Sequence, residues 1–396
     1  MRVRWLKAIA AGASATLLAV ACGGTPSPAT AGGSAGGVAQ ELRAEGAEVN
    51  LYWPANSNFQ QFVSQVLAPG FEDYTKKMYG VAVHVNVLQS GGGDAAFLQK
   101  LQANGTQPGF DIDVARTAPS TTLLQVMDDG LLEPLSGHRE LPNLTMIDRP
   151  GRQTFTHAGK VYGAAVYRPT MSLFYNANLV PNPPRSLAEL LSFAKAHPGK
   201  VSYEDPRSTT GTGSGTMFLL TVMHAYANPV DRTNWSRGWS YLRQLQQWVT
   251  PEPATGDQLV DLFQRGEIEV MPYWNDAGLF ARDELKISGM KNLLIKEGFP
   301  VRYTPLVIPA GAAHKEAALL LVNYALSPEI QRKLATMMHQ IPASTAPSIV
   351  AGLPAQTFGF PLSEIDRTSF PSYNSSAALA AIADLNASYA TEVLGR

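Results

Sequence analysis

The sequence contains very little cysteine, since Cys22 is the only one in 396 residues. A single thiol excludes an intrachain disulfide and any metal cluster built on cysteine. The seven histidines include no pair three or four residues apart, so a zinc site on one helix has no support. No Ser/His/Asp arrangement can be singled out. We therefore expect no metal, no cofactor and no enzymatic activity.

The chain also lacks an excess of charge of either sign, with 31 basic and 32 acidic residues. Residues 1–21 contain three of the basic residues and no acid, which leaves 28 basic against 32 acidic residues in the remainder. Nucleic-acid-binding domains normally carry a clear basic excess, so we expect no nucleic acid partner. Hydrophobic residues make up 45% of the chain, which is enough to form a sizeable core.

Long apolar runs are missing after the N-terminus. Residues 1–7 are basic, and residues 8–21 form an uncharged, mostly apolar run. This run is too short to cross a bilayer of about 30 Å and fits the core of a signal peptide. It ends in Leu18-Ala19-Val20-Ala21 before Cys22, which resembles a bacterial lipobox with leucine displaced by one position. An ordinary secretory signal with an incidental cysteine is the alternative.

From this we expect residues 1–21 to be a signal peptide and Cys22 to carry a lipid. The lipid would anchor the protein to the outer face of the cell membrane, which is the periplasmic side in a diderm. Residues 23–39 contain only Gly, Thr, Pro, Ser, Ala and one Val, a composition that does not form a core. We therefore predict a flexible linker over residues 22–47.

The rest of the chain alternates between strand and helix patterns. Alternating or short apolar runs predict strands at residues 48–53, 81–88, 110–115 and 268–273. Helical spacing predicts helices at residues 59–74, 95–103, 121–128, 217–226 and 257–265, and a capping box at Ser186–Glu189 opens another. This alternation predicts an α/β fold with mainly parallel sheets flanked by helices.

Several separate segments resemble one family. The family is that of the solute-binding proteins of bacterial ABC importers, whose segments are similar to residues 161–166, 173–176, 184–191 and 265–268. The strongest similarity lies in residues 308–312, 314–318, 323–331 and 341–344. The chain is most similar to the group with polyamine-, thiamine- and iron-binding members. The iron-binding branch uses adjacent tyrosines, and this sequence contains no Tyr-Tyr pair.

The resemblance implies a two-lobed, periplasmic-binding-protein-like fold of type II. Lobe 1 would comprise residues 48–165 and, as a return segment with the C-terminal helices, residues 306–396. Lobe 2 would comprise residues 166–305. Two crossings, near Tyr162–Met171 and Phe299–Val307, would form a hinge that closes on a solute. The partners implied are a small-molecule solute and an ABC transporter permease with its ATPase, and we expect a monomer.

Ligands of open α/β sheets bind beyond the carboxyl ends of the strands, and this rule selects candidate residues. The loop after the first strand offers Trp53, Asn56, Ser57 and Asn58, although Trp53 in the core and Asn58 as a helix cap is the alternative. The glycine-rich loop after the second strand offers Ser90. The loop after the third strand offers Thr117 and Ser120, and Tyr167 lies in the first crossing.

Two further loops suggest the charge of the solute. Thr210, Thr212 and Ser214 lie in a Thr/Gly/Ser loop before a helix, where backbone N–H groups and hydroxyls can bind an anion; a plain helix-capping turn is the alternative. Trp274, Asn275 and Asp276 follow a strand, and an aromatic ring beside a carboxylate suits an organic cation. There the alternative is a core tryptophan followed by a helix-capping aspartate.

The sequence thus predicts a lipoprotein that captures a small polar organic solute in an interlobe cleft and delivers it for import. The solute is expected to be cationic or zwitterionic, like a polyamine or thiamine. The alternatives are a secreted lipoprotein hydrolase on an α/β scaffold and a receptor of the same fold that reports to a sensor.

The anchor can be tested by the substitution Cys22→Ser. We expect the variant to lose acyl-label incorporation and to leave the membrane fraction, because the substitution removes the only thiol that could carry the lipid. An acyl label retained by the variant would show that the lipobox interpretation is wrong.

Overall fold

The structure is a computed structural model that describes residues 35–53, 57–88, 93–208, 213–371 and 375–395, with the backbone alone at residues 57, 58 and 376. The predicted signal peptide, Cys22 and the linker up to residue 34 lie outside the described residues. So do four predicted site residues, namely Asn56, Ser90, Thr210 and Thr212.

The larger sheet combines strands from distant parts of the chain. Its order is β2 (His84–Leu88), β1 (Glu48–Tyr52), β3 (Val114–Arg116), β11 (Thr304–Val307) and β6 (Ala164–Tyr167). Strand β1 pairs in parallel with β2 and β3, whereas β11 runs antiparallel to both β3 and β6. The carboxyl ends of β1, β2, β3 and β6 therefore meet at one edge, together with the amino end of β11.

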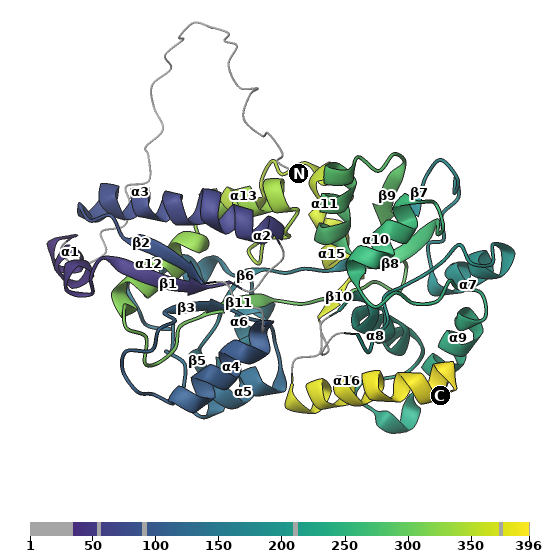
Figure 1. The fold of residues 1–396 in the computed structure, drawn as a ribbon, viewed down its shortest axis with the longest axis horizontal. Coiled ribbons are helices and arrows are strands. Elements are labelled where there is room, and N and C mark those ends of the chain that lie inside the picture. The colour runs from purple at the N-terminus through teal and green to yellow at the C-terminus, as the bar shows by residue number, and fades with distance from the viewer. Residues whose placement is uncertain (1–34, 54–56, 89–92, 209–212, 372–374, 396) are drawn as a thin grey trace, which may run out of the picture. The chain divides into compact units, whose positions relative to one another are not determined.

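Helices cover this sheet on both sides. In Figure 1, α3 lies on one side of β1 and β2, and α4 and α5 lie on the other. The helices are α2 (Ser57–Phe62), a π-helical turn (Val63–Leu67), α3 (Ala68–Tyr79), α4 (Gly93–Asn104), α5 (Thr121–Asp128), α12 (Lys315–Ala325) and α13 (Pro328–Met338). The helices predicted at residues 59–74, 95–103 and 121–128 are confirmed, although the first continues to Tyr79 and ends at Gly80 with a φ of 70°.

The second sheet has the order β8 (Val270–Trp274), β7 (Met171–Asn176) and β9 (Met290–Leu293), and all its pairs are antiparallel. Its helices are α7 (Leu187–Ala196), α8 (Ser214–Tyr226), α9 (Ser236–Gln246), α10 (Gly256–Gln264) and α11 (Asn275–Leu285). Helix α7 begins at the predicted capping box, where the Ser186 hydroxyl accepts from the backbone N–H of Glu189 at 3.1 Å.

The expectation of mainly parallel sheets is correct only for β1, β2 and β3. The other pairs within these two sheets are antiparallel. The reason is that β11 returns from far along the chain and is inserted with reversed direction. The second sheet likewise pairs β7 with strands that lie about a hundred residues later.

Two segments connect the sheets, and they are hydrogen-bonded to each other. The first, Arg168–Thr170, joins β6 to β7, and the second, residues 294–303, joins β9 to β11 and contains the short β10 (Pro300–Val301). The Arg302 backbone N–H donates to the Pro169 carbonyl at 3.0 Å, and the Thr170 hydroxyl donates to the Pro300 carbonyl at 3.1 Å. The first lies within the predicted crossing Tyr162–Met171, and the second overlaps the predicted crossing Phe299–Val307.

Six short elements are β4 (Thr156–His157), β5 (Lys160–Val161), β12 (Phe370–Pro371), α6 (Arg149–Thr154), α14 (Pro347–Val350) and α15 (Leu362–Thr368). The long helix α16 (Ser376–Tyr389) follows near the C-terminus. Helix α16 packs against α5 and α8, and the Tyr389 hydroxyl lies 2.6 Å from that of Tyr203. The limits of the two lobes stay a prediction.

The predicted linker is wrong over its last part, because residues 35–44 form helix α1 (Ala35–Ala44). Val38, Ala39 and Leu42 are buried against α3 and α12. The Glu45 carboxylate then accepts from the backbone N–H groups of Glu316 and Ala317, at 3.0 and 3.2 Å, and so caps α12. The helix was not predicted because the segment is rich in glycine, and such a composition does not indicate a short apolar face.

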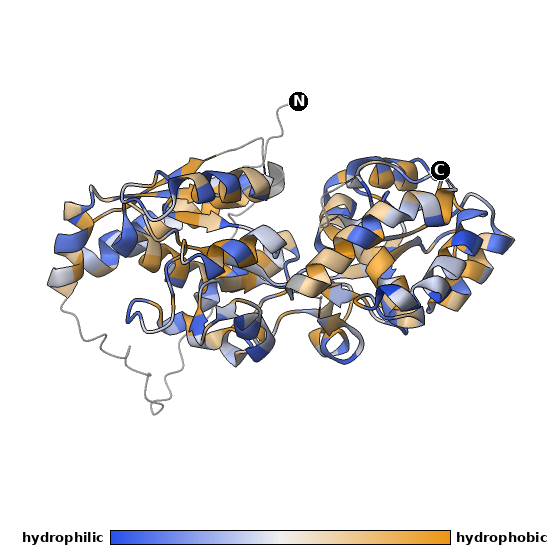
Figure 2. Cartoon of the chain, turned by 90° about the horizontal axis from the view of Figure 1, so that it is seen from below, coloured by the Kyte–Doolittle hydropathy of each residue, from blue (hydrophilic) through white to orange (hydrophobic). Residues whose placement is uncertain are grey.

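Figure 2 shows apolar colour concentrated on the strands and on one side of many helices, which is the pattern of a buried core. Within the described residues, no helix is both long and apolar enough to cross a membrane.

One buried carboxylate ties the larger sheet to α12. Asp113 is fully buried and accepts from the Asn50 backbone N–H at 2.7 Å and from the His314 backbone N–H at 2.9 Å. It also contacts the His314 ring Nδ1 at 2.7 Å. The side chain thus satisfies backbone donors of both β1 and the residue that precedes α12.

We expect Asp113→Ala to lower the free energy of unfolding by at least about 2 kcal/mol, because it leaves two backbone donors without an acceptor. Urea denaturation measures the loss. The matched control is Asp111→Ala, since the Asp111 side chain is 62% exposed and bonds only to Lys100 among the described residues. We expect the control to change stability by less than about 0.5 kcal/mol. Equal losses in the two variants would contradict this account.

Candidate functional site

Three of the predicted site residues meet at the carboxyl edge of the larger sheet. Trp53 follows β1, Thr117 follows β3 and Tyr167 ends β6. Phe59 links two of them, because its ring centroid lies 6.1 Å from that of Trp53 and 5.7 Å from that of Tyr167. The Thr117 backbone N–H donates to the Pro305 carbonyl at 3.2 Å, which holds this loop beside β11.

Arg116 lies at the same edge, and its charge is paired. Its Nε donates to the Tyr167 hydroxyl at 3.1 Å, and its Nη1 lies 3.4 Å from the Asp94 carboxylate at the start of α4. Burial alone would lower the pKa of Arg116, but Tyr167 and Asp94 raise it above its usual value. Arg116 is therefore a fixed cation.

Arg302, from the second crossing, is a buried cation of a different kind. It is 9% exposed, and its guanidinium carbon lies 5.1 Å from the ring centroid of Trp274. Its Nε and Nη1 are buried and have no hydrogen-bond partner among the described residues. Burial lowers the pKa of Arg302 to about 10, and the positive charge of Arg116 acts in the same direction.

Asp276 lies in the first turn of α11, where Gln340 reaches it. The Gln340 Nε2 donates to the Asp276 carboxylate at 2.5 Å, while the Gln340 Oε1 is buried with no partner in the described part of the chain. Burial raises the pKa of Asp276, although Gln340 and backbone N–H groups of the first turn partly oppose this. The carboxylate is thus bonded but poorly solvated.

Asn275 binds other protein groups instead of facing a cavity. It is 1% exposed, and its Oδ1 accepts from the Ser172 hydroxyl at 2.9 Å and from Asn292 at 2.7 Å. Its Nδ2 donates to the Phe358 carbonyl at 3.2 Å. These contacts join β7, β9 and the segment after α14.

Ser214, at the start of α8, is also engaged by the protein. Its backbone N–H donates to the Glu204 carboxylate at 2.8 Å, and its hydroxyl donates to the same oxygen. A Cβ on the adjacent Gly215 would lie 2.0 Å from the Glu204 carbonyl oxygen, so this glycine permits close backbone packing. These contacts favour the helix-capping alternative for the described end of this loop.

The other predicted residues are placed as follows. The Ser120 hydroxyl accepts from the Leu123 backbone N–H at 3.0 Å and caps α5. Ser57 and Asn58 are the first residues of α2, so Asn58 lies inside the helix and does not precede it. The structure describes only their backbone, and Asn56, Ser90, Thr210 and Thr212 lie outside the described residues.

Four of the residues described above, namely Asp94, Arg116, Arg302 and Gln340, were not among the candidates selected from the sequence. Arg302 left a signal, because it is the only charged residue between Phe299 and Val307. Arginine is almost never fully buried unless it is paired, so a lone arginine in an apolar crossing indicates a partner. Arg116 and Asp94 follow predicted strands and fit the strand-end rule, whereas nothing in its local pattern marks Gln340.

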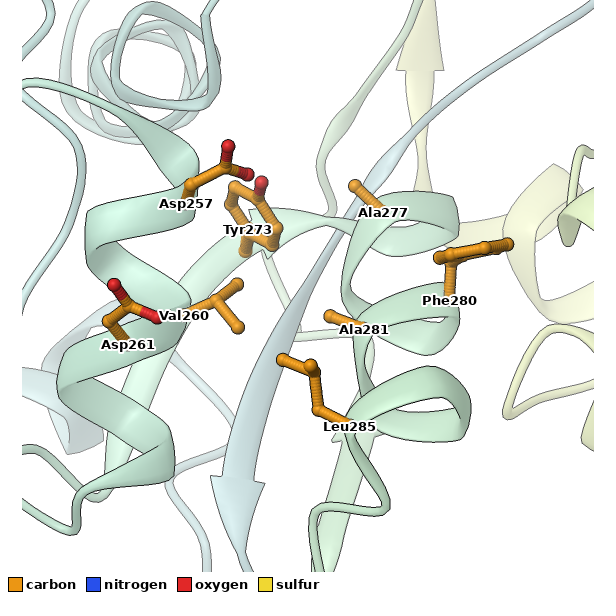
Figure 3. A pocket seen from close by; sticks show the side chains of 8 residues that line it. All are labelled: Asp257, Val260, Asp261, Tyr273, Ala277, Phe280, Ala281 and Leu285. Atoms are coloured by element: carbon orange, nitrogen blue, oxygen red, sulfur yellow. The ribbon is translucent and has the colours of Figure 1, made fainter. Parts of the chain in front are cut away.

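Two hollows in the described part of the chain are lined by residues other than those discussed above. One hollow, of about 200 Å³, lies between α10 and α11. Figure 3 shows its lining, with Asp257, Val260 and Asp261 on one side and Ala277, Ala281 and Leu285 on the other. A second, of about 310 Å³, is lined by Arg168, Tyr303, Asp366 and Phe370 among others. Among the described residues, no group of three or more His, Cys, Asp or Glu side chains is arranged to hold a metal.

Comparison with known proteins identifies the family. Residues 71–348 match the model of the bacterial extracellular solute-binding proteins. The chain belongs to this family. Protein YnjB of Escherichia coli strain K12 is 26% identical over 290 residues, which cover 66% of this chain and 70% of YnjB.

Solved structures show the same fold at low sequence identity. The GacH receptor of Streptomyces glaucescens matches with a TM-score of 0.70 and 18% identity over 88% of this chain and 93% of its own. PotD, a spermidine/putrescine ABC transporter substrate-binding protein from Streptococcus pneumoniae, matches with a TM-score of 0.65 and 15% identity over 87% and 99%. The solute-binding protein described here thus has the two-lobed fold of periplasmic binding proteins, as predicted.

The buried position of Asp276 gives a pH-dependent prediction. Because its pKa is raised above the ordinary value of 3.8 in the folded state, folding disfavours the ionised form. The contribution of Asp276 to stability is fully present below that value and is lost as the pH rises through the folded pKa. We expect the unfolding free energy of ligand-free wild type, minus that of Asp276→Asn, to fall as the pH rises from 3.8. Denaturation of both proteins across this range measures the difference, and a rise would contradict the assignment.

Proposed function

We propose that this solute-binding protein captures a small polar organic solute between its lobes and delivers it to the permease of an ABC importer. The family supports the coarser part, an extracellular solute-binding protein of ABC transport. We further propose that it acts as a monomer held at the membrane by a lipid on Cys22.

One observation supports the proposed location of the binding site. Several buried polar atoms that have no hydrogen-bond partner among the described residues lie around the edge where the crossings leave the larger sheet: Trp53 Nε1, Thr117 Oγ1, Thr304 Oγ1, and Nε and Nη1 of Arg302. Buried polar groups are nearly always hydrogen-bonded in folded proteins. Thr304 pairs with Tyr167 across β11 and β6, so it belongs to the same edge. A polar solute would supply the missing partners.

Of the two solute charges that the sequence leaves open, the geometry favours the zwitterion. The Asp276 carboxylate and the unpartnered Gln340 Oε1 can accept hydrogen bonds from an ammonium or hydroxyl group. Arg302, however, already lies over one face of the Trp274 ring. A second cation on that face would meet a like charge, so a solute with only positive groups fits poorly. No observation at the described site favours the hydrolase alternative.

Closure on the solute tests this function. A thermal-shift screen of polyamines, amino acids, thiamine, phosphorylated small molecules and sugars should find a solute, because a ligand at 100 times its dissociation constant adds about 2.7 kcal/mol to stability. We expect that solute to reduce the radius of gyration measured by X-ray scattering and to change the tryptophan fluorescence, since Trp53 and Trp274 lie at the site. Saturated binding without change in either signal would exclude capture by closure.

A further inference from the structure

The two crossings contain two buried arginines, Arg168 and Arg302, which differ in their hydrogen bonds. Arg168 is 7% exposed; its Nη1 donates to the Asp366 carboxylate at 2.7 Å, and its Nε donates to the Pro342 carbonyl at 3.0 Å. Arg302 is 9% exposed, yet its Nε and Nη1 have no acceptor among the described residues. A buried cation without acceptors is costly, so its burial calls for an acceptor other than these protein groups.

Nearby carboxylates do not fill that role. Asp94 lies within ion-pair distance of Arg116, and Asp276 accepts from Gln340. Both carboxylates influence Arg302 only through space, as does the positive charge of Arg116. Among the residues that the structure describes, therefore, no protein group accepts a hydrogen bond from Nε or Nη1 of Arg302.

The geometry of Arg302 leaves its Nε and Nη1 donors without acceptors among the described residues. Its backbone N–H is held by the Pro169 carbonyl at 3.0 Å, which fixes the start of the side chain at the junction of the crossings. The guanidinium carbon lies over the Trp274 ring, 5.1 Å from the ring centroid. The N–H groups of a guanidinium lie in its own plane, so Nε and Nη1 can each donate to an oxygen of a carboxylate or phosphate.

We propose that Arg302 is the docking point for an oxyanion, a carboxylate or a phosphate, on the native solute. This inference rests on the proposed function and names the chemical class of the solute. The Gln340 Oε1 and the Asp276 carboxylate bind a donor group at the other end of the same molecule. Because Arg302 lies in the second crossing and its backbone is bonded to the first, binding of the oxyanion takes place at the hinge itself.

The first test needs no ligand. In the ligand-free protein, Arg302→Met should have a melting temperature at least equal to that of wild type, since methionine removes an unpaired buried charge and keeps much of the volume. The matched control Arg168→Met should melt several degrees lower, because it leaves Asp366 and the Pro342 carbonyl without their donor. A comparable decrease for Arg302→Met would overturn the proposal, as it would show that Arg302 stabilises the fold.

The second test uses probe pairs that differ in the oxyanion: putrescine and 4-aminobutyrate, thiamine and thiamine monophosphate, fructose and fructose 6-phosphate. We expect the oxyanion member of at least one pair to raise the melting temperature of wild type more than its parent does. Isothermal titration should then show at least tenfold weaker binding of that compound to Arg302→Met. The pairs also distinguish a carboxylate from a phosphate.

The failure of this proposal is distinguishable from failure of the proposed function. If putrescine, thiamine or fructose binds as tightly as its oxyanion counterpart and compacts the protein, capture by closure stands and the oxyanion site is wrong. If an oxyanion probe binds through Arg302 without compaction, the site is correct and capture by closure is wrong.

Discussion

The contact between the two crossings is the constraint on which the rest of the site depends. Two hydrogen bonds, from Arg302 N–H to Pro169 and from the Thr170 hydroxyl to Pro300, hold these segments together. They bring a charged side chain to the edge where four strands of the larger sheet end. Trp274 reaches the same place because Met171, the first residue after the crossing, pairs with it in the second sheet. Residues from distant parts of the chain thus meet at one junction.

Much of the local structure could be predicted from the sequence. Helix α5 has the predicted bounds, Thr121 to Asp128, and Ser186 caps α7 where the capping box indicates. Strand β1 also begins at the predicted residue, Glu48. These elements have strong local signals, such as apolar spacing and a capping serine, which do not depend on distant residues. Helix α1 lacked such a signal, since its three buried residues lie in a glycine- and alanine-rich segment.

The candidate site was less predictable, because its chemistry depends on pairing that no local pattern shows. The strand-end rule brought Trp53 and Thr117 to one edge, where Tyr167, selected for its place in the first crossing, also lies. It could not show that Ser214 is bonded to Glu204, or that Asn275 is bonded to Ser172 and Asn292. Nor could it show that Arg302 would lie over Trp274, which places a buried positive charge against the ring that the sequence offered to a cation.

A crystal structure of the protein with its bound solute tests the central claim most directly. The account predicts an oxygen of a carboxylate or phosphate within about 3.2 Å of the Arg302 Nε or Nη1, with the guanidinium still over the Trp274 ring. A bound solute whose groups leave both of these nitrogens without an acceptor, or whose anionic group lies only at the loop before α8, would contradict it.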